Sequence, residues 1–102
     1  MLHQAVRNLA ENALRYTPLN TTVEIHVAES GTVSVLDEGP GVLAAERELI
    51  FRRFWRRDRG RTAGAGLGLA IVARIVEVHA GKIDVGDRPS GGAVFSLRLG
   101  VL

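Results

Sequence analysis

The sequence predicts a single α/β (α+β) domain, a two-layer sandwich with a mixed or antiparallel sheet and helices on one face of that sheet. The length of 102 residues suits one small domain. Helical and alternating apolar patterns follow one another in the order helix, two strands, helix, loop, helix, two strands. A short turn joins the strands of each pair, so we expect antiparallel hairpins that bury one face against the helices.

The first half of the chain is expected to form a helix and a hairpin. Leu2, Val6, Leu9 and Ala13 follow helical spacing, so residues 2–16 are predicted to be an amphipathic helix, which Pro18 ends. Residues 22–28 alternate between polar and apolar side chains and predict a strand. A Ser-Gly turn at residues 30–31 leads into a second strand over residues 32–36.

The second half is expected to repeat the helix-and-hairpin order. A break rich in turn residues at 37–41 precedes a short helix over residues 44–55, and the glycine-containing segment that follows predicts a mobile loop. Residues 67–79 predict an apolar helix that Gly81 ends. Residues 82–85 and 93–99 predict two strands joined by a turn around residues 89–92.

Composition excludes several classes of protein. The chain has no cysteine, so it has neither a disulfide framework nor a thiolate metal site, and its three scattered histidines do not suggest zinc. No apolar run approaches the roughly 18 residues of a membrane span, and no signal peptide is visible, so we expect a soluble, cytoplasmic chain without membrane contact. Six arginines lie between residues 52 and 61. Such a basic run can bind nucleic acid, contact a phosphate ligand or simply remain solvated.

One polar stripe on the first helix has the chemistry of a ligand site. Asn8, Asn12, Arg15 and Tyr16 share it, beside the apolar stripe. An asparagine oxygen can complete the shell of a magnesium ion, and an arginine can hold phosphate. The alternative is an exposed polar face with no ligand.

Two glycine-containing segments add to this pattern. Asp37 follows a strand, where its carboxylate can accept a hydrogen bond from an exocyclic amine, and Gly39 and Gly41 allow the backbone close to a flat ring. Glycines before the helix expected at residues 67–79 can leave N–H groups free for an anion. Each segment alone is also explained as an ordinary turn or linker.

Five segments in order resemble the sequence boxes of sensor histidine kinases, and the resemblance covers essentially the whole chain. The segments are NLAENALRYTP at residues 8–18 (N box), DEGPG at 37–41 (first glycine box), IFRRFWRRD at 50–58 (F box), GAGLGLAIV at 64–72 (second glycine box) and GGAVF at 91–95 (closing glycine segment). The resemblance implies the Bergerat ATP-binding fold, with ATP and magnesium as cofactors.

The resemblance also implies a role for each site residue. Asn12 would bind magnesium with support from Asn8, Arg15 would approach the phosphates, Tyr16 would approach the nucleotide, and Asp37 would read the adenine amino group. Residues 56–65 would form a lid over ATP. The remaining positions implied are nucleotide-binding backbone at Gly39, Gly41, Gly64, Gly66, Leu67 and Gly68, and lid anchors at Phe51 and Phe54.

The kinase branch of this fold is favoured over its ATPase branch. Chaperone, topoisomerase and mismatch-repair ATPases typically place a hydrolytic glutamate where this chain has Asn8, and an amide cannot act as a base. Glu11 lies off the polar stripe and is interpreted as surface charge. None of the histidines lies in an acceptor motif: His3, His26 and His79.

The chain is therefore expected to be an incomplete kinase part. It would need a dimerisation domain carrying the phosphoacceptor histidine, and a response regulator downstream, and a membrane anchor is an option for the parent kinase. The family's usual first strand and helix are missing before residue 1, which predicts an unpaired sheet edge and exposed apolar surface. The alternatives are a non-catalytic interaction module and a nucleic-acid binder that uses the arginines of residues 52–61.

Overall fold

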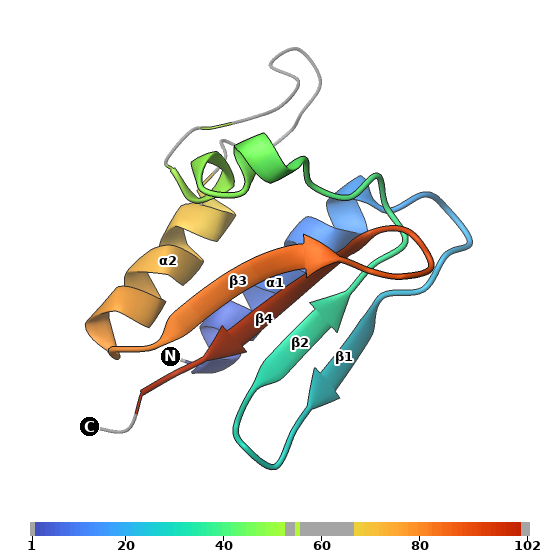
Figure 1. The fold of residues 1–102 in the computed structure, drawn as a ribbon. Helices are drawn as coiled ribbons and strands as arrows, with labels where there is room; N and C mark the ends of the chain where they lie inside the picture. The colour runs from blue at the N-terminus through green and yellow to red at the C-terminus, as the bar shows by residue number, and fades with distance from the viewer. Residues whose placement is uncertain (1, 53–54, 56–66, 101–102) are drawn as a thin grey trace.

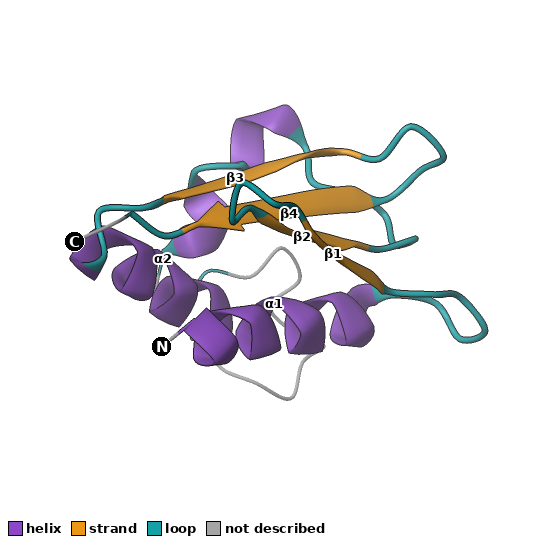
Figure 2. Ribbon diagram, turned by 90° about the horizontal axis from the view of Figure 1, so that it is seen from below, coloured by secondary structure: helices purple, strands orange, loops and turns teal. Residues whose placement is uncertain are grey.

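The computed structural model describes residues 2–52, 55 and 67–100, and in this part the chain forms two layers. One layer is a four-stranded sheet in the order β1-β2-β4-β3, with every neighbouring pair antiparallel. Helices α1 and α2 cover one face of it (Figures 1 and 2). The predicted two-layer architecture is confirmed. The elements are α1 (Leu2–Tyr16), β1 (Glu24–Val27), β2 (Val33–Leu36), η1 (Ala44–Glu46), η2 (Leu49–Phe51), α2 (Gly68–Val78), β3 (Lys82–Asp87) and β4 (Ala93–Arg98).

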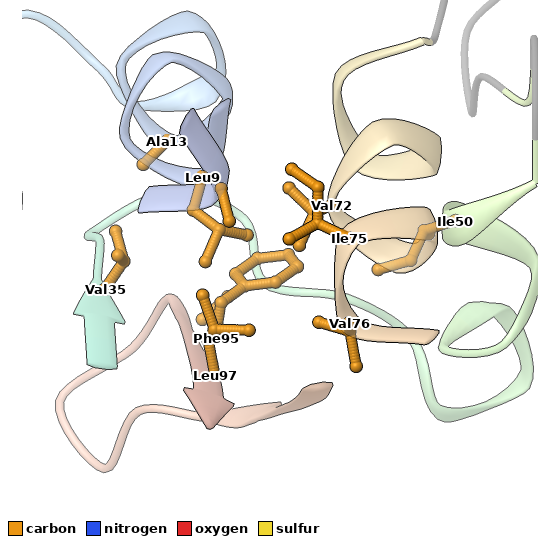
Figure 3. Close-up of a cluster of buried hydrophobic side chains, with 11 residues drawn as sticks. Leu9, Ala13, Val35, Ile50, Val72, Ile75, Val76, Phe95 and Leu97 are labelled. Carbon is orange, nitrogen blue, oxygen red and sulfur yellow. The ribbon is translucent and has the colours of Figure 1, made fainter. Parts of the chain in front are cut away.

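The core lies between the two helices and the two central strands. Figure 3 shows the Phe95 ring of β4 among side chains from α1 and α2. Val35 and Leu97 close the sheet side of the cluster, and Leu9 and Val72 close the helix side; all of these are buried. The alternation of β2 and β4 and the 3.6-residue period of α1 therefore supply one continuous apolar interior.

Strand β1 is the edge of the described sheet. Ile25 pairs with Val35 and Val27 with Val33, so the two β1 side chains lie on the face that the core uses. They are nevertheless 48% and 73% exposed, because the helices leave the β1 end of this face uncovered. An apolar, unpaired edge is thus present among the described residues. That a further strand and helix normally cover it stays a prediction.

The prediction of one helix over residues 44–55 is wrong for the residues of this range that the structure describes. The chain makes two short 3-10 turns, η1 and η2, drawn in green in Figure 1, each closed by an i→i+3 bond such as Arg52 N–H to Leu49 O at 2.9 Å. Leu49, Ile50 and Phe51 are adjacent in sequence, so a full α-helix would spread them around its axis. A tight turn followed by extended backbone at Arg52 buries Ile50 and part of Phe51.

Most other boundaries differ from the expectation by one or two residues. The helix expected at 67–79 is observed over Gly68–Val78, and β3 extends beyond the expected residue 85 to Asp87. The extra residues pair with the start of β4, Gly86 with Val94 and Asp87 with Ala93. The loop expected over residues 56–66 lies outside the described residues. No helix in the described part is both long and apolar enough to cross a bilayer.

The residue that ends α2 is not the expected Gly81. Ala80, not Gly81, takes the left-handed conformation that closes the helix, with φ of 51°. Gly81 then donates its N–H to Val76 O at 2.8 Å. A Cβ at Gly81 would lie 2.2 Å from Arg98 O, so glycine is required there for close approach to the end of β4 and not for its φ.

Replacing Ala80 with glycine should therefore stabilise the chain. A non-glycine residue in the left-handed region carries a conformational cost that exceeds the extra unfolded-state entropy of glycine, so Ala80→Gly should raise the free energy of unfolding by about 0.5–1 kcal/mol and Tm by about 2–8 °C. Thermal unfolding followed by circular dichroism measures this. The matched control is Ala70→Gly within α2, which should lower stability by about 1 kcal/mol. Equal losses in both variants would contradict the assignment.

Candidate functional site

The polar stripe of α1 lies beside the start of α2. Asn8 and Asn12 are half-buried, next to the buried stripe formed by Ala5, Leu9 and Ala13. A Cβ built on Gly68 would lie 3.8 Å from Asn8 Oδ1, so the first turn of α2 comes close to this amide. The fold therefore brings together two segments that are 60 residues apart in sequence.

The rest of the stripe is less enclosed. Arg15 is exposed in the last turn of α1. Tyr16 closes the helix, and its side chain lies outside the described part of the chain. Glu11 pairs with Arg7, with 2.9 Å between Oε1 and Nε, on the exposed side of the helix, as the interpretation of Glu11 as surface charge requires. The structure thus gathers the amides at the helix interface and leaves the charged groups at the surface.

Among the described residues, the backbone N–H groups at the N-terminus of α2 find no acceptor. Leu67 precedes the helix without a side-chain cap, and the first helical bond runs from Ile71 N–H to Leu67 O at 2.9 Å. The N–H groups of the first turn before Ile71 therefore have no partner within the helix, and they carry the positive end of its dipole. Such a terminus favours an anion. Gly64 and Gly66 lie outside the described residues.

The turn after β2 holds Asp37 in a fixed position. Asp37 is 6% exposed, and its Oδ1 accepts hydrogen bonds from Gly39 N–H at 2.8 Å and from Ala93 N–H at 3.2 Å. The first bond forms an Asx-turn, so Oδ1 has the role that it has in an ordinary turn. In the part of the chain that the structure describes, Oδ2 accepts no hydrogen bond. This second oxygen keeps its capacity to accept one from a ligand.

The closing glycine segment packs directly on this turn. Gly92 has a φ of 105°, and a Cβ on it would lie 2.0 Å from the carbonyl oxygen of Asp37. Gly41 has a φ of 76° and would bring a Cβ to 3.4 Å from Gly92 O. Gly92 needs glycine because of this close contact and its φ, whereas Gly41 needs glycine because of its φ alone. The expected access of a flat ring to Gly41 stays a prediction.

The F-box side chains that the structure describes belong to the core edge. Phe51 is half-buried, and its ring meets Phe95 edge-on, with centroids 6.3 Å apart and an interplanar angle of 82°. Trp55 also packs against the core cluster. Phe54 and the expected lid at residues 56–65 lie outside the described residues. Phe51 therefore has the core contact expected of an anchor, while its role toward a lid stays a prediction.

The described residues suit a metal that is shared with phosphates. They hold no group of three or more His, Cys, Asp or Glu side chains placed to bind an ion. Asn8 and Asn12 offer amide oxygens, which magnesium accepts, and magnesium is commonly bound by one or two protein groups together with substrate phosphates and water. The donor set therefore fits a magnesium ion that arrives with a nucleotide.

The elements that carry these groups are placed differently in Figure 1. The N-terminal end of α2 lies in the upper part of the picture beside the 3-10 turns, whereas β2 ends lower down, and the segment after it leads up to η1. Asn12 lies on α1, Asp37 follows β2 and Gly68 begins α2. Sequence reasoning missed Arg88, whose guanidinium donates to Asp37 O at 3.4 Å; no local motif marks it, because its partners are more than 50 residues away.

Comparisons with known proteins agree on one family. Residues 1–101 match the family described as histidine kinase-, DNA gyrase B- and HSP90-like ATPase. The chain is 41% identical over 104 residues to the sensor protein IrlS of Burkholderia pseudomallei, covering 96% of this chain. It spans only 22% of the length of that protein.

Solved structures give the same answer. The mycobacterial sensor histidine kinase MprB has a TM-score of 0.83 at 32% identity, covering 94% of this chain and 67% of that one. Full-length ShkA, solved in complex with AMPPNP, has a TM-score of 0.73 at 37% identity, covering 94% of this chain and 20% of that one. The sheet and helices described above are thus those of histidine kinase ATP-binding domains, and the expected Bergerat fold is confirmed.

Proposed function

The chain belongs to the family of histidine kinase-, DNA gyrase B- and HSP90-like ATPases, and we propose that it is the catalytic core of a two-component sensor histidine kinase, which binds ATP with magnesium. The observation that carries this proposal is the close approach of Gly68, in the first turn of α2, to the Asn8 amide of α1. The relatives and structures named above support a sensor kinase, since IrlS and MprB are sensor proteins.

Each group has a defined task in this proposal. Asp37 Oδ2 accepts a hydrogen bond from the adenine amino group, while Oδ1 keeps the carboxylate in place through Gly39 and Ala93. The free N–H groups at the start of α2 bind phosphate oxygens, and Arg15 approaches the same phosphates from α1. Asn12 offers its amide oxygen to magnesium, and Asn8 supports it. Bound magnesium would neutralise phosphate charge.

Phosphate transfer suits this site better than hydrolysis. Hydrolysis needs a base to activate water, and Asn8 and Asn12 cannot accept a proton at neutral pH. Glu11 is paired with Arg7 on the surface. The residues of the site therefore position ATP and spread its charge without activating water, which is what a transferase requires.

The acceptor of the γ-phosphate lies on a separate domain or chain. We assign it to a histidine of a dimerisation domain, with a response regulator as the next acceptor. The chain spans 22% of IrlS, which leaves ample length in such relatives for these parts. We propose that a further strand and helix pack on the exposed β1 edge, which carries Ile25 and Val27.

Binding of magnesium-ATP should raise the melting temperature. At ten times the dissociation constant, a ligand adds about 1.4 kcal/mol to stability, which corresponds to about 6–11 °C in a domain of this size. Asn12→Ala, or removal of magnesium, should abolish the shift. Gln4→Ala is the matched control, since it removes an exposed amide near the other end of α1 and should leave the shift intact.

The outcomes separate a kinase core from a non-catalytic module. A cooperative melt that ignores magnesium-ATP would contradict the proposal and favour an interaction module without nucleotide. If ATP binds, the chain is mixed with a histidine-containing dimerisation domain and radiolabelled ATP. Label should appear on that histidine, and its absence after verified binding would contradict kinase activity.

Asp37→Asn tests the adenine contact cleanly. Asparagine retains an Oδ1 that can accept from Gly39 and Ala93, so the turn should persist, but the second oxygen becomes an NH₂ donor that faces the adenine amine. ATP affinity should fall by about 1–3 kcal/mol, or roughly 5- to 150-fold, with Tm nearly unchanged. Isothermal titration with ATP and with ITP, which lacks the amine, measures it. An equal loss for both nucleotides would argue against Asp37 as the adenine reader.

A further inference from the structure

One arginine braces the turn of Asp37 from the face of the sheet opposite the helices. Arg88 follows β3, and its guanidinium forms an ion pair with Glu24 of β1, at the far edge of the sheet. Glu24 pairs with Leu36, the residue before Asp37. Because Ile25 lies on the core face, Glu24 lies on the opposite face, and the arginine side chain crosses the sheet there.

The same guanidinium reaches the backbone of Asp37. Arg88 Nη1 lies 3.4 Å from the carbonyl oxygen of Asp37, while Nη2 bonds to Glu24 Oε2. The Arg88 side chain is only 17% exposed and that of Glu24 is 39% exposed. Water therefore competes weakly for the guanidinium, and its orientation is set by these two partners.

The backbone of Arg88 is tied to the same place. Its N–H donates to Gly92 O at 3.1 Å, and its carbonyl accepts from Gly91 N–H at 2.8 Å. Gly92 is the residue whose Cα packs on the Asp37 carbonyl. The side chain of Arg88 thus reaches the peptide group that joins Asp37 to Glu38 directly, while its main chain is bonded to Gly92, which packs on that group.

A second tie runs from this turn to β1. Glu38 Oε2 accepts a hydrogen bond from Thr22 N–H at 2.7 Å, two residues before Glu24. The turn is therefore held to the edge strand by Glu38 directly and by Arg88 through Glu24. Neither tie belongs to the strand ladder, which ends with Glu24 opposite Leu36.

We infer that Arg88, fixed by Glu24, is a positioning residue that sets the direction of the Asp37 carboxylate and thereby the selectivity of the site for 6-aminopurine nucleotides. The inference rests on the proposed function, in which Asp37 Oδ2 meets the adenine amine. Arg88 acts through the Asp37 carbonyl and does not touch the nucleotide. A carboxylate that turns away loses the bond to the amine, while the phosphate contacts of α1 and α2 are unaffected.

The test compares ATP with ITP, which carries a carbonyl in place of the amine. Arg88→Gln should weaken magnesium-ATP binding about three- to tenfold in isothermal titration and change magnesium-ITP binding much less, so the ATP-to-ITP affinity ratio falls. Glu24→Gln should lower the ratio in the same direction, and Arg88→Lys should restore part of it. Arg74→Gln is the matched control, since it removes an exposed ion pair with Glu77 on α2 and should leave the ratio unchanged.

A second measurement does not depend on nucleotide. In the free protein, amide hydrogen exchange at Gly39 and Ala93 reports the two bonds to Asp37 Oδ1, and Arg88→Gln should speed exchange several-fold at both. Unchanged exchange, or equal losses of ATP and ITP affinity, would overturn the positioning role. If the wild-type chain binds neither nucleotide, the proposed function fails, while the exchange data still decide whether Arg88 holds the turn.

Discussion

Replacing Gly92 with alanine is expected to lower the free energy of unfolding by about 2–5 kcal/mol. A Cβ there would lie 2.0 Å from the carbonyl oxygen of Asp37 and 3.0 Å from the Cα of Glu38, so backbone must shift, and the φ of 105° is unfavourable for any L side chain. Domains of this size have a total stability of about 5–15 kcal/mol. The loss is therefore a large part of the whole.

Gly91→Ala separates the two causes. Gly91 has a φ of 100°, but a Cβ on it would meet nothing within 4 Å. Urea unfolding of both variants should show a loss of about 1–2 kcal/mol for Gly91→Ala and a clearly larger one for Gly92→Ala. Equal losses would mean that conformation alone sets the effect and that the contact with Asp37 is not tight. In any folded fraction of Gly92→Ala, ATP affinity should also fall, because the turn of Asp37 must move.

The second large effect is expected at the centre of the core. Phe95 is buried between α1, α2 and β2, so Phe95→Ala should lower the free energy of unfolding by about 3–5 kcal/mol. Val94→Ala is the control, because Val94 is the half-buried neighbour on the opposite face of β4 and should cost much less. Chemical denaturation measures both. Similar losses at the two positions would contradict the layer arrangement.

The edge-on contact between Phe95 and Phe51 can be measured separately. A double-mutant cycle with Phe51→Ala and Phe95→Ala should give a coupling of about 0.5–1.5 kcal/mol, because the rings meet at 82°. A folded background is needed, so Leu replaces Ala where Phe95→Ala does not fold. A coupling near zero would remove the link between the F box and the core.

The parts of the fold set by local patterns could be predicted from the sequence. Helix α1 and both hairpins follow from apolar periodicity interrupted by turn residues, and these signals lie within each segment. The prediction of a helix over residues 44–55 was wrong, because Ile50 and Phe51 are buried by packing against distant elements. Such packing overrides a short helical pattern. The prediction that Gly81 ends α2 was wrong by one residue, because Ala80 takes the left-handed conformation. Gly81 is needed for its close approach to Arg98 and not for its φ.

The site shows the same division. Asn8, Asn12 and Asp37 were recognisable because their segments have characteristic spacing, and the resemblance put these segments in one family. The tie between Asp37 and Ala93 and the brace by Arg88 could not be predicted, since both depend on which strands become neighbours. A sequence pattern shows which residues are equipped for chemistry, whereas tertiary contacts determine how their atoms are oriented.

The bond from Ala93 to Asp37 also has a consequence for synthesis on the ribosome. One half of the turn that we propose reads adenine lies within the first 41 residues, but its partner strand begins at residue 93. A nascent chain that has exposed α1, β1, β2 and α2 still lacks the N–H that fixes the Asp37 carboxylate. The Asp37 carboxylate is thus fixed only after residue 93 has left the exit tunnel, so nucleotide bound through this proposed contact cannot assist the earlier assembly of α1, β1 and β2.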